Sequence, residues 1–306
     1  MMTVKYLITH SGGFHADELL SSVVLTRLFP KAELVRTRDV SWLEPGPEKI
    51  IYDVGGCYNS AKGVFDHHQR PCPIRVDGQP FSSFGLIWKH FGKEYIADMA
   101  VPSIDIDPIH KMFDLDFVLP IDLLDNGIMD PSVAGALSYL TLPNLLANLR
   151  PPYDDRSPTA DKDAFFSALS IAQNFIESAI RDYAGKARAR KVILEAIKKV
   201  GKSQILELPQ GMPYLSALNE AAAPQILFVI YPRGADWTLN GIKLSNNTFQ
   251  QRADLPIMWA GLTDEALEKA TGVVGAKFCH NARFIAVAKT RGAILEMAKM
   301  AVRLAQ

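Results

Sequence analysis

The first seventy residues contain apolar segments of strand length before and after a segment of helix length. This order of strand and helix patterns limits the possible folds more than any other feature of the sequence. We expect strands at residues 4–9, 32–35 and 49–54, and residues 16–29 have the apolar spacing of a helix. Strands that alternate with helices form a mostly parallel sheet. In such sheets functional groups lie beyond the carboxyl ends of the strands. The sequence therefore predicts an α/β fold with a site at that edge.

The rest of the chain predicts three parts. Helical patterns occupy residues 82–91, 115–126 and 132–146, and Pro151-Pro152 with a polar run marks a break. A helical pattern rich in Ala, Lys and Arg follows over about residues 164–200. From residue 205 a smaller α/β unit begins, with strands at 226–231, 237–239 and 284–288 and helices after 264 and at 293–304. We expect a first domain over 1–150, a helical linker over 151–203 and a C-terminal domain over 204–306.

Acidic and imidazole side chains follow apolar runs at four places in the first domain. They are His10, His15 and Asp17 in THSGGFHADE; Asp53 in IYDVGG; Asp66, His67 and His68 in VFDHHQR; and Asp122 with Asp125 in LPIDLLDNG. Each place alone has an ordinary explanation, such as a helix cap, a loop histidine or a solvated acidic face. However, four of the seven histidines lie beside carboxylates in two of these places, which favours one shared site.

Imidazole and carboxylate ligands without cysteine suit manganese, magnesium, iron or zinc, and they argue against a closed structural zinc site. The candidates are too numerous for one ion. Two ions about 4 Å apart that share a carboxylate can activate a water and stabilise displacement at phosphorus. This chemistry predicts hydrolysis of a phosphoester.

Composition narrows the class of partner and the compartment. Lys plus Arg equals Asp plus Glu at 33 each, so the charge gives no reason to expect wrapping of long nucleic acid. Cys57, Cys72 and Cys279 are too scattered for a disulfide framework. No apolar run reaches the length of a membrane helix, and the first residues do not resemble a signal peptide. We expect a cytoplasmic protein without a membrane partner.

The sequence resembles the DHH-motif phosphoesterase superfamily and, within it, the melanocyte-proliferating-gene (MYG) protein family. The matching sequence motifs, in order, are THSGGFHADE, YDVGG, FDHHQR, FSSFGLIWKHFG, LLDNG, PIMWAGL and FCHNARFIAVAKT. They cover essentially the whole chain. The resemblance implies an N-terminal DHH domain with a mainly parallel sheet, a helical linker and a smaller C-terminal α/β domain that closes over the cleft.

The resemblance also implies roles for individual residues. The metal ligands would be His10, His15, Asp17, Asp53, His67 and Asp122, with Asp53 bridging two ions and Asp125 orienting a histidine. His68 would contact a phosphate oxygen or protonate the leaving oxygen, while Asp66 holds the neighbouring ring. The first motif has an imidazole where the superfamily usually has a carboxylate. This makes the site softer and less negative, so manganese is not the only candidate, and zinc and magnesium are the alternatives.

Similarity favours a 3′–5′ exonuclease acting on single-stranded RNA or short oligonucleotides. Substrate cations would come from the C-terminal domain, where the candidates are Arg252, His280, Arg283 and Lys289. Exposed Trp237 or Phe278 could stack a base. Two alternatives remain at this point: a phosphatase for a small phosphorylated metabolite, and a metal-bound regulatory protein without turnover. Chains of this type often form homodimers.

Overall fold

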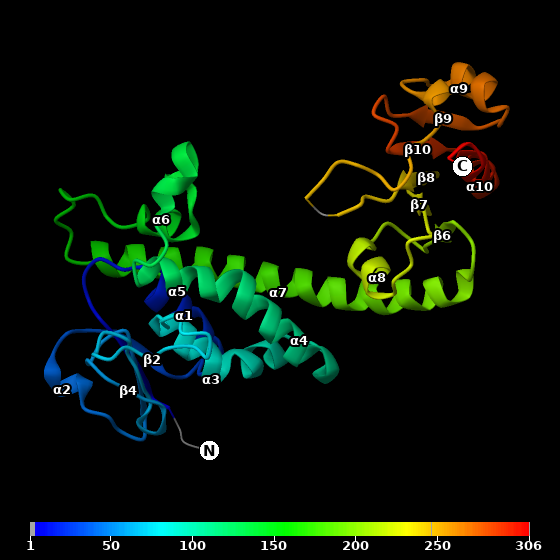
Figure 1. Ribbon diagram of the computed structural model, residues 1–306. Coiled ribbons are helices and arrows are strands. Elements are labelled where there is room, and N and C mark those ends of the chain that lie inside the picture. Colours follow the sequence, from blue (N-terminus) through cyan, green and yellow to red (C-terminus); the bar gives the residue numbers. More distant parts are fainter. Residues whose placement is uncertain (1–3, 246, 306) are drawn as a thin grey trace. The chain divides into compact units, whose positions relative to one another are not determined.

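The computed structural model describes residues 4–245 and 247–305, and the chain divides into two compact units, Met1–Ala184 and Gly185–Gln306 (Figure 1). The boundary falls inside the long helix α7, Ala160–Val200. This helix lies within the stretch expected as a linker, residues 151–203. The ends of the expected domains, residues 1–3 and 306, lie outside the described residues. The expected division into three parts stays a prediction.

The sheet of the first unit has the order β2-β1-β3-β5-β4. Its strands are β1 (Tyr6–Thr9), β2 (Glu33–Arg36), β3 (Lys49–Tyr52), β4 (Tyr58–Asn59) and β5 (Val64–Phe65). All neighbouring pairs are parallel except β4 with β5. The central strands are almost fully buried, as their continuous apolar sequences require when both faces of a parallel sheet are covered. The expected α/β class with a mainly parallel sheet is confirmed.

The helices of the first unit follow the predicted order with three differences. They are α1 (Ala16–Leu28), α2 (Val40–Leu43), α3 (Ser83–Asp98), α4 (Ser103–Phe113), α5 (Leu119–Asp125) and α6 (Leu142–Ala147), and 3₁₀ turns occupy Ser60–Lys62 and Pro131–Leu140. Helices α2 and α4 were not expected. The helix expected over 132–146 is broken, because Gly135 has φ 59° and ψ −126° and Thr141 is extended. A single π-helical turn, Asp114–Val118, precedes α5.

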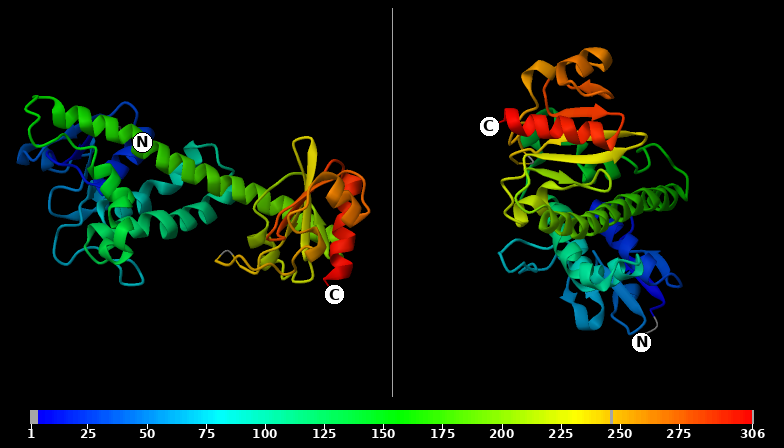
Figure 2. Two further views of the ribbon diagram at one scale, coloured as in Figure 1. Left: turned by 90° about the horizontal axis from the view of Figure 1, so that it is seen from above. Right: turned by 90° about the vertical axis from the view of Figure 1, so that its right-hand side faces the viewer.

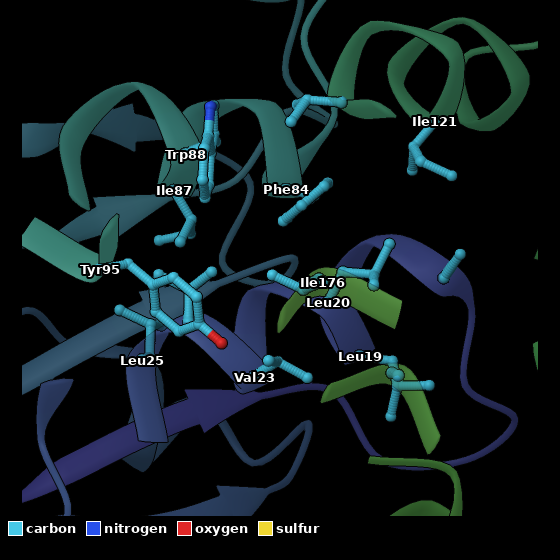
Figure 3. Packing of buried hydrophobic residues seen from close by; sticks show 14 of the residues in the cluster. Leu19, Leu20, Val23, Leu25, Phe84, Ile87, Trp88, Tyr95, Ile121 and Ile176 are labelled. Carbon is cyan, nitrogen blue, oxygen red and sulfur yellow. The ribbon is translucent and has the colours of Figure 1, made fainter. Parts of the chain in front are cut away.

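Helix α1 lies in the centre of the first unit and is buried from Ala16 to Leu25. It contacts β1, α3, α5 and α6. Figure 3 shows Leu20 of α1 close to Phe84 of α3 and Ile176 of α7, with Ile121 of α5 on the same side of the cluster. A helix buried on all sides has little freedom to rotate. This packing fixes the direction of the side chains in the first turn of α1.

The second unit has a mixed sheet with the order β6-β7-β8-β10-β9. Its strands are β6 (Ile205–Glu207), β7 (Phe228–Arg233), β8 (Asp236–Gly241), β9 (Ala276–Cys279) and β10 (Ile285–Ala288), and only β6 with β7 is parallel. The helices are α8 (Leu215–Glu220), α9 (Asp264–Thr271) and α10 (Arg291–Leu304), with a 3₁₀ turn at Ile257–Trp259. Helix α10, red in Figure 2, packs against β6, β7, β8 and β10. Strands β6 and β9 and helix α8 were not expected.

Within the described ranges, no helix combines the length and the apolar character that crossing a bilayer requires.

Candidate metal centre

Polar residues follow three parallel strands of the first unit at the point where each strand ends. His10 follows β1, Asp53 follows β3, and Asp66 and His67 follow β5. Because the strands are parallel, these ends share one edge of the sheet. His10 Nε2 lies 3.2 Å from Asp53 Oδ2, and His67 Nε2 lies 3.5 Å from Asp53 Oδ1. The structure therefore brings together the ends of strands that are well separated in the chain.

Asp53 has a backbone conformation that few residues other than glycine adopt, with φ 54°. Gly55 and Gly56 follow it, also with positive φ, so the chain turns sharply after β3. Ser83 Oγ, in the first turn of α3, donates a hydrogen bond of 3.2 Å to Asp53 Oδ1. Burial alone would raise the pKa of Asp53, but hydrogen bonds from His10 and His67 outweigh it and hold that pKa well below its usual range. Asp53 is thus an ionised carboxylate between two imidazoles.

The first turn of α1 contributes two further buried carboxylates. Glu18 is fully buried and accepts hydrogen bonds of 2.7 and 2.9 Å from the backbone N–H of His15, the residue before the helix. Its Oε1 also lies 3.1 Å from His10 Nε2. Glu18 stands in the THSGGFHADE word, although the expected ligand set did not include it. Its negative charge also suits a helix N-terminus.

Asp17 is the most informative member because it is 1% exposed and neither of its oxygens has a hydrogen-bond partner among the described residues. His67 Nε2 lies 3.8 Å from its Oδ2. Burial raises the pKa of Asp17 well above its usual value, and the neighbouring charges of Asp53 and Asp125 raise it further. A buried carboxylate without donors is costly unless a cation accompanies it. Asp17 is therefore a buried acidic group that pairs with the His67 imidazole at long range but accepts no hydrogen bond from the described residues.

The ring of His10 is oriented so that one nitrogen can serve as a ligand. Its Nδ1 donates to the carbonyl oxygen of Ser11 at 3.2 Å, which leaves Nε2 facing Glu18 and Asp53. Burial lowers the pKa of His10, but Asp53 and Glu18 outweigh this and raise it to about 10. Without another cation, the imidazole itself thus supplies the positive charge between these carboxylates.

The donor set as a whole fits divalent cations. Four groups of three side chains each offer ligand atoms within 4.8 Å of one another: His10, His15 and Glu18; Asp17, Glu18 and Asp53; Asp53, His67 and His68; and Asp17, His67 and Asp125. Imidazole nitrogens and carboxylate oxygens are ligands that manganese, zinc and iron accept. Of these side chains, we call Asp17, Glu18, Asp53, Asp125, His10, His15 and His67 the carboxylate–imidazole cluster. His15 is exposed, with its ring centroid 5.9 Å from that of His10.

His68 lies at the exposed side of this cluster and is held by Asp66. Asp66 is buried and its Oδ1 lies 2.6 Å from His68 Nδ1, while its Oδ2 accepts from the backbone N–H of Gly56. The side chain of His68 is 60% exposed. The hydrogen bond to Asp66 raises the pKa of His68 above its ordinary value. A proton on His68 is therefore retained at higher pH than on a free histidine.

The model of the uncharacterised protein family UPF0160, MYG1_exonuc, matches residues 6–302 of the chain. The chain belongs to this family. The MYG1 protein of Schizosaccharomyces pombe is 32% identical over 99% of the chain and 98% of its own length. MYG1 exonuclease of Bos taurus is 34% identical over 98% of the chain and 85% of its own length. The expected MYG family is confirmed.

Solved structures add little to this assignment. Manganese-bound RecJ from Thermus thermophilus has 13% identity and a TM-score of 0.28, and the match covers 98% of this chain and 52% of that chain. The chain therefore spans about half the length of that RecJ. At this TM-score the likeness is too weak to carry an argument about fold or activity.

Within this UPF0160 member, Asp122 and Asp125 contact different parts of the first unit. Asp125 Oδ2 lies 3.2 Å from His67 Nε2, so Asp125 belongs to the carboxylate–imidazole cluster. The fully buried Asp122 points the other way and accepts hydrogen bonds from Ser82 Oγ at 2.7 Å and Arg75 Nη2 at 2.6 Å. Residues three apart on an α-helix are offset by about 60° around its axis, and here this offset is enough for Asp125 to face the cluster while Asp122 faces the start of α3.

Asp122 links three segments of the chain. Arg75 bridges it to Asp114 with hydrogen bonds of 2.6 and 3.0 Å to the latter carboxylate. Gly85, in the first turn of α3, leaves room for the Asp122 carboxylate, because a Cβ at this position would overlap both of its oxygens. Burial raises the pKa of Asp122 to about 6, although Ser82 and Arg75 act in the opposite direction. The network holds α5 against α3, and thereby sets the position of Asp125.

The cations expected to bind substrate in the second unit are mostly engaged within the protein. Arg252 Nη1 donates to the carbonyl oxygens of Ala223 and Ile226 at 2.7 and 3.0 Å, and Arg283 Nη2 lies 2.8 Å from Asp254 Oδ2. The remaining two candidates, His280 and Lys289, follow β9 and β10 respectively.

Strands β9 and β10 are antiparallel, so His280 and Lys289 lie at opposite ends of this strand pair. The expected set of four cations is therefore not one cluster. Trp237 and Phe278 are both partly buried and belong to strands β8 and β9.

Several residues of the centre were not identified from the sequence. Ser82, Ser83 and Gly85 belong to the FSSFG motif, which contributed to the family resemblance but whose residues were assigned no role. Arg75 lies in a polar loop. Ser82 also caps α3. A serine pair before an apolar helix signals a cap, but it does not show which distant carboxylates the hydroxyls reach.

Proposed function

We propose that the chain is a metal-dependent phosphodiesterase that removes nucleotides from the 3′ ends of single-stranded RNA or short oligonucleotides. The observation that carries this proposal is the buried carboxylate of Asp17, which has no donor among the described residues and lies among Glu18, Asp53 and Asp125. Relatives over nearly the whole chain are named MYG1 exonuclease in Mus musculus and Homo sapiens. The net charge of zero suits chain ends better than long duplexes.

In this proposal two divalent ions, manganese first, are held by His10, His15, Asp17, Asp53, His67 and Asp125, with Glu18 beside them. Such ions supply an activated water and withdraw charge from phosphoryl oxygens. Asp53 is assigned the shared position because its two oxygens face His10 and His67 separately. Asp125 replaces Asp122 in the proposed ligand set because Asp125 faces His67, whereas Asp122 is held by Ser82 and Arg75.

His68 is proposed to protonate the leaving oxygen. Its Nδ1 is engaged by Asp66, so the ring is oriented and Nε2 can donate a proton to an oxygen in the site. The raised pKa of His68 keeps it protonated above the usual imidazole range.

If His68 is the proton donor, the rate of the wild type should fall at high pH, where His68 loses its proton. His68→Gln should lower the rate by about 100-fold and remove this fall in rate at high pH. Asp66→Asn should move that fall to lower pH, and an unchanged pH profile in both variants would contradict this role.

The test of the function uses chelator-treated protein with labelled single-stranded RNA and with p-nitrophenyl phosphate, to which manganese, magnesium or zinc is returned. Labels at the 5′ or the 3′ end reveal the direction of digestion. Asp53→Ala should lose at least about 10³-fold in rate, because several kcal/mol of transition-state stabilisation depend on the ions. Asp39→Ala, at an exposed helix cap, is the matched control. Full activity in Asp53→Ala would refute the mechanism, and hydrolysis of p-nitrophenyl phosphate alone would favour a phosphatase.

A further inference from the structure

A pocket of about 370 Å³ lies in the first unit directly beside the carboxylate–imidazole cluster. His15 and Asp125 belong both to the cluster and to the wall of the pocket. Its volume is within the range of sites that bind small molecules. Every lining residue belongs to the first unit, so the pocket is formed without the second unit. We call it the Arg150 pocket.

One part of the lining is apolar. Ile121 and Leu124 of α5 and Pro131 and Pro143 of the following segments contribute to it. Apolar walls of this kind suit a flat, weakly polar group such as a nucleobase, whose faces gain from leaving water. They offer little to a simple phosphate or a sugar phosphate alone.

The polar part of the lining contains a guanidinium with free donors. Arg150 is anchored to the first motif, since its Nε donates to the carbonyl oxygen of Phe14. Among the described residues, its two terminal nitrogens have neither a hydrogen-bond nor an ion-pair partner. These nitrogens form a planar fork that matches a phosphate. Arg150, whose guanidinium carbon also lies 5.9 Å from the centroid of the Phe14 ring, thus places a cation without an ion-pair partner among the described residues in the same pocket wall as Asp125.

Thr141 also contributes a group without a partner. Its Oγ1 is buried and has no hydrogen-bond partner in the described part of the chain, and Thr141 lines the pocket. A buried hydroxyl without a partner costs free energy that a bound ligand recovers. The pocket therefore combines an apolar wall, a free hydroxyl and a free guanidinium.

We propose that the Arg150 pocket binds the terminal nucleotide of the substrate, with the base against the apolar wall and Arg150 at its phosphate. Thr141 donates to the sugar or the base. This inference rests on the proposed function, and it adds a binding site in the first unit to the cations expected in the second. A nucleoside monophosphate, the product of the proposed reaction, is then a ligand of the same pocket.

The test measures binding of AMP and of adenosine to the full chain by calorimetry, with and without manganese. Arg150→Met should lower the affinity for AMP at least about tenfold and the affinity for adenosine less than about twofold, because only AMP carries the phosphate. Arg150→Lys should recover part of the AMP affinity. Thr141→Val should weaken both ligands, by about threefold to tenfold. Arg156→Met, at an exposed arginine of the same unit, is the matched control.

The manganese affinity shows whether Arg150 instead supports the structure of the loop at Phe14. If Arg150 acts only in nucleotide binding, the manganese affinity of Arg150→Met should stay within about twofold of the wild type. The proposal is overturned if the wild-type chain does not bind AMP, or if Arg150→Met and Thr141→Val bind both ligands as the wild type does. RNA hydrolysis with unchanged AMP binding in the variants would refute the pocket and leave the proposed function intact. If AMP binding depends on Arg150 but the chain hydrolyses no RNA, the pocket is supported and the proposed function is refuted.

Discussion

The polar edge of the first sheet and the cations of the second unit differ in one respect, which is whether protein groups already satisfy them. Asp17 is buried and its oxygens have no donor among the described residues, whereas Arg252 donates to two carbonyl oxygens and Arg283 pairs with Asp254. A buried charge without a protein partner points to a ligand. A surface arginine with several partners points to a structural role. Charge by itself is therefore a poor guide to the site.

Strand direction explains much of this difference. In the first sheet β1, β3 and β5 are parallel, so the residues that follow them arrive at one edge. In the second sheet β7, β8, β10 and β9 alternate in direction, so residues after successive strands lie at opposite edges. His280 and Lys289 show this separation. Polar residues that follow apolar strands therefore lie together at one edge of the first sheet, whereas in the second sheet they lie at opposite edges.

The largest effect is expected for Asp17→Asn, which changes the buried carboxylate that accepts no hydrogen bond from the described residues. Metal affinity should fall by more than about 100-fold, since even residues that only orient ligands cost 10- to 100-fold. Without metal the variant should become more stable than the wild type as the pH rises, by up to about 1–3 kcal/mol, because the raised pKa of Asp17 means that ionising this buried carboxyl costs free energy of folding. With manganese at about 100 times its Kd, only the wild type should gain about 2.7 kcal/mol.

Thermal and urea unfolding with and without manganese measure both effects of Asp17→Asn. Asp39→Asn makes the same chemical change at an exposed cap and should leave the metal response intact. Equal metal-dependent stabilisation in Asp17→Asn and the wild type would remove the contrast between the two units.

A smaller effect is expected for Gly85→Ala, which tests how the cluster is supported. The added methyl group would overlap the Asp122 carboxylate and push α5 away from α3, at a cost of about 1–3 kcal/mol in the free energy of unfolding. Gly185→Ala in α7 meets only Arg188 Nη2, at 3.8 Å, and should be neutral or stabilising by about 0.5–1 kcal/mol. Urea unfolding measures both. If the two variants behave alike, the Asp122 network does not hold α5.

The smallest effect is expected for the second unit. Lys289→Met should raise KM for RNA about twofold to threefold and lower the salt dependence of binding by about one phosphate contact. Arg252→Met should instead lower the free energy of unfolding by about 1–3 kcal/mol, because it leaves two carbonyl oxygens without their donor. Titration of RNA binding against salt, together with urea unfolding, separates the two. A stable Arg252→Met with a selective loss of RNA binding would restore its expected role.

Local sequence was sufficient for two of the strands that carry the cluster, β1 and β3, whereas the short strand β5 was not predicted. The apolar runs before His10 and Asp53 predicted β1 and β3 within two residues of their ends. It failed where the backbone depends on one residue or on distant packing. Gly135 breaks the helix expected over 132–146, and α4 contains Pro108, which lowers its helical signal although the surrounding helices stabilise it.

The sequence by itself determined the kind of chemistry, because apolar runs followed by carboxylates and imidazoles specify both a parallel sheet and metal-capable groups at its edge. Only the tertiary structure placed Asp125 rather than Asp122 beside His67, placed Glu18 beside His10 and left Asp17 without a donor among the described residues. The reason is geometric: ligand selection depends on side-chain directions and distances of a few ångströms between elements. Those distances follow from how α1, α3 and α5 pack together, and that packing involves residues far apart in the chain.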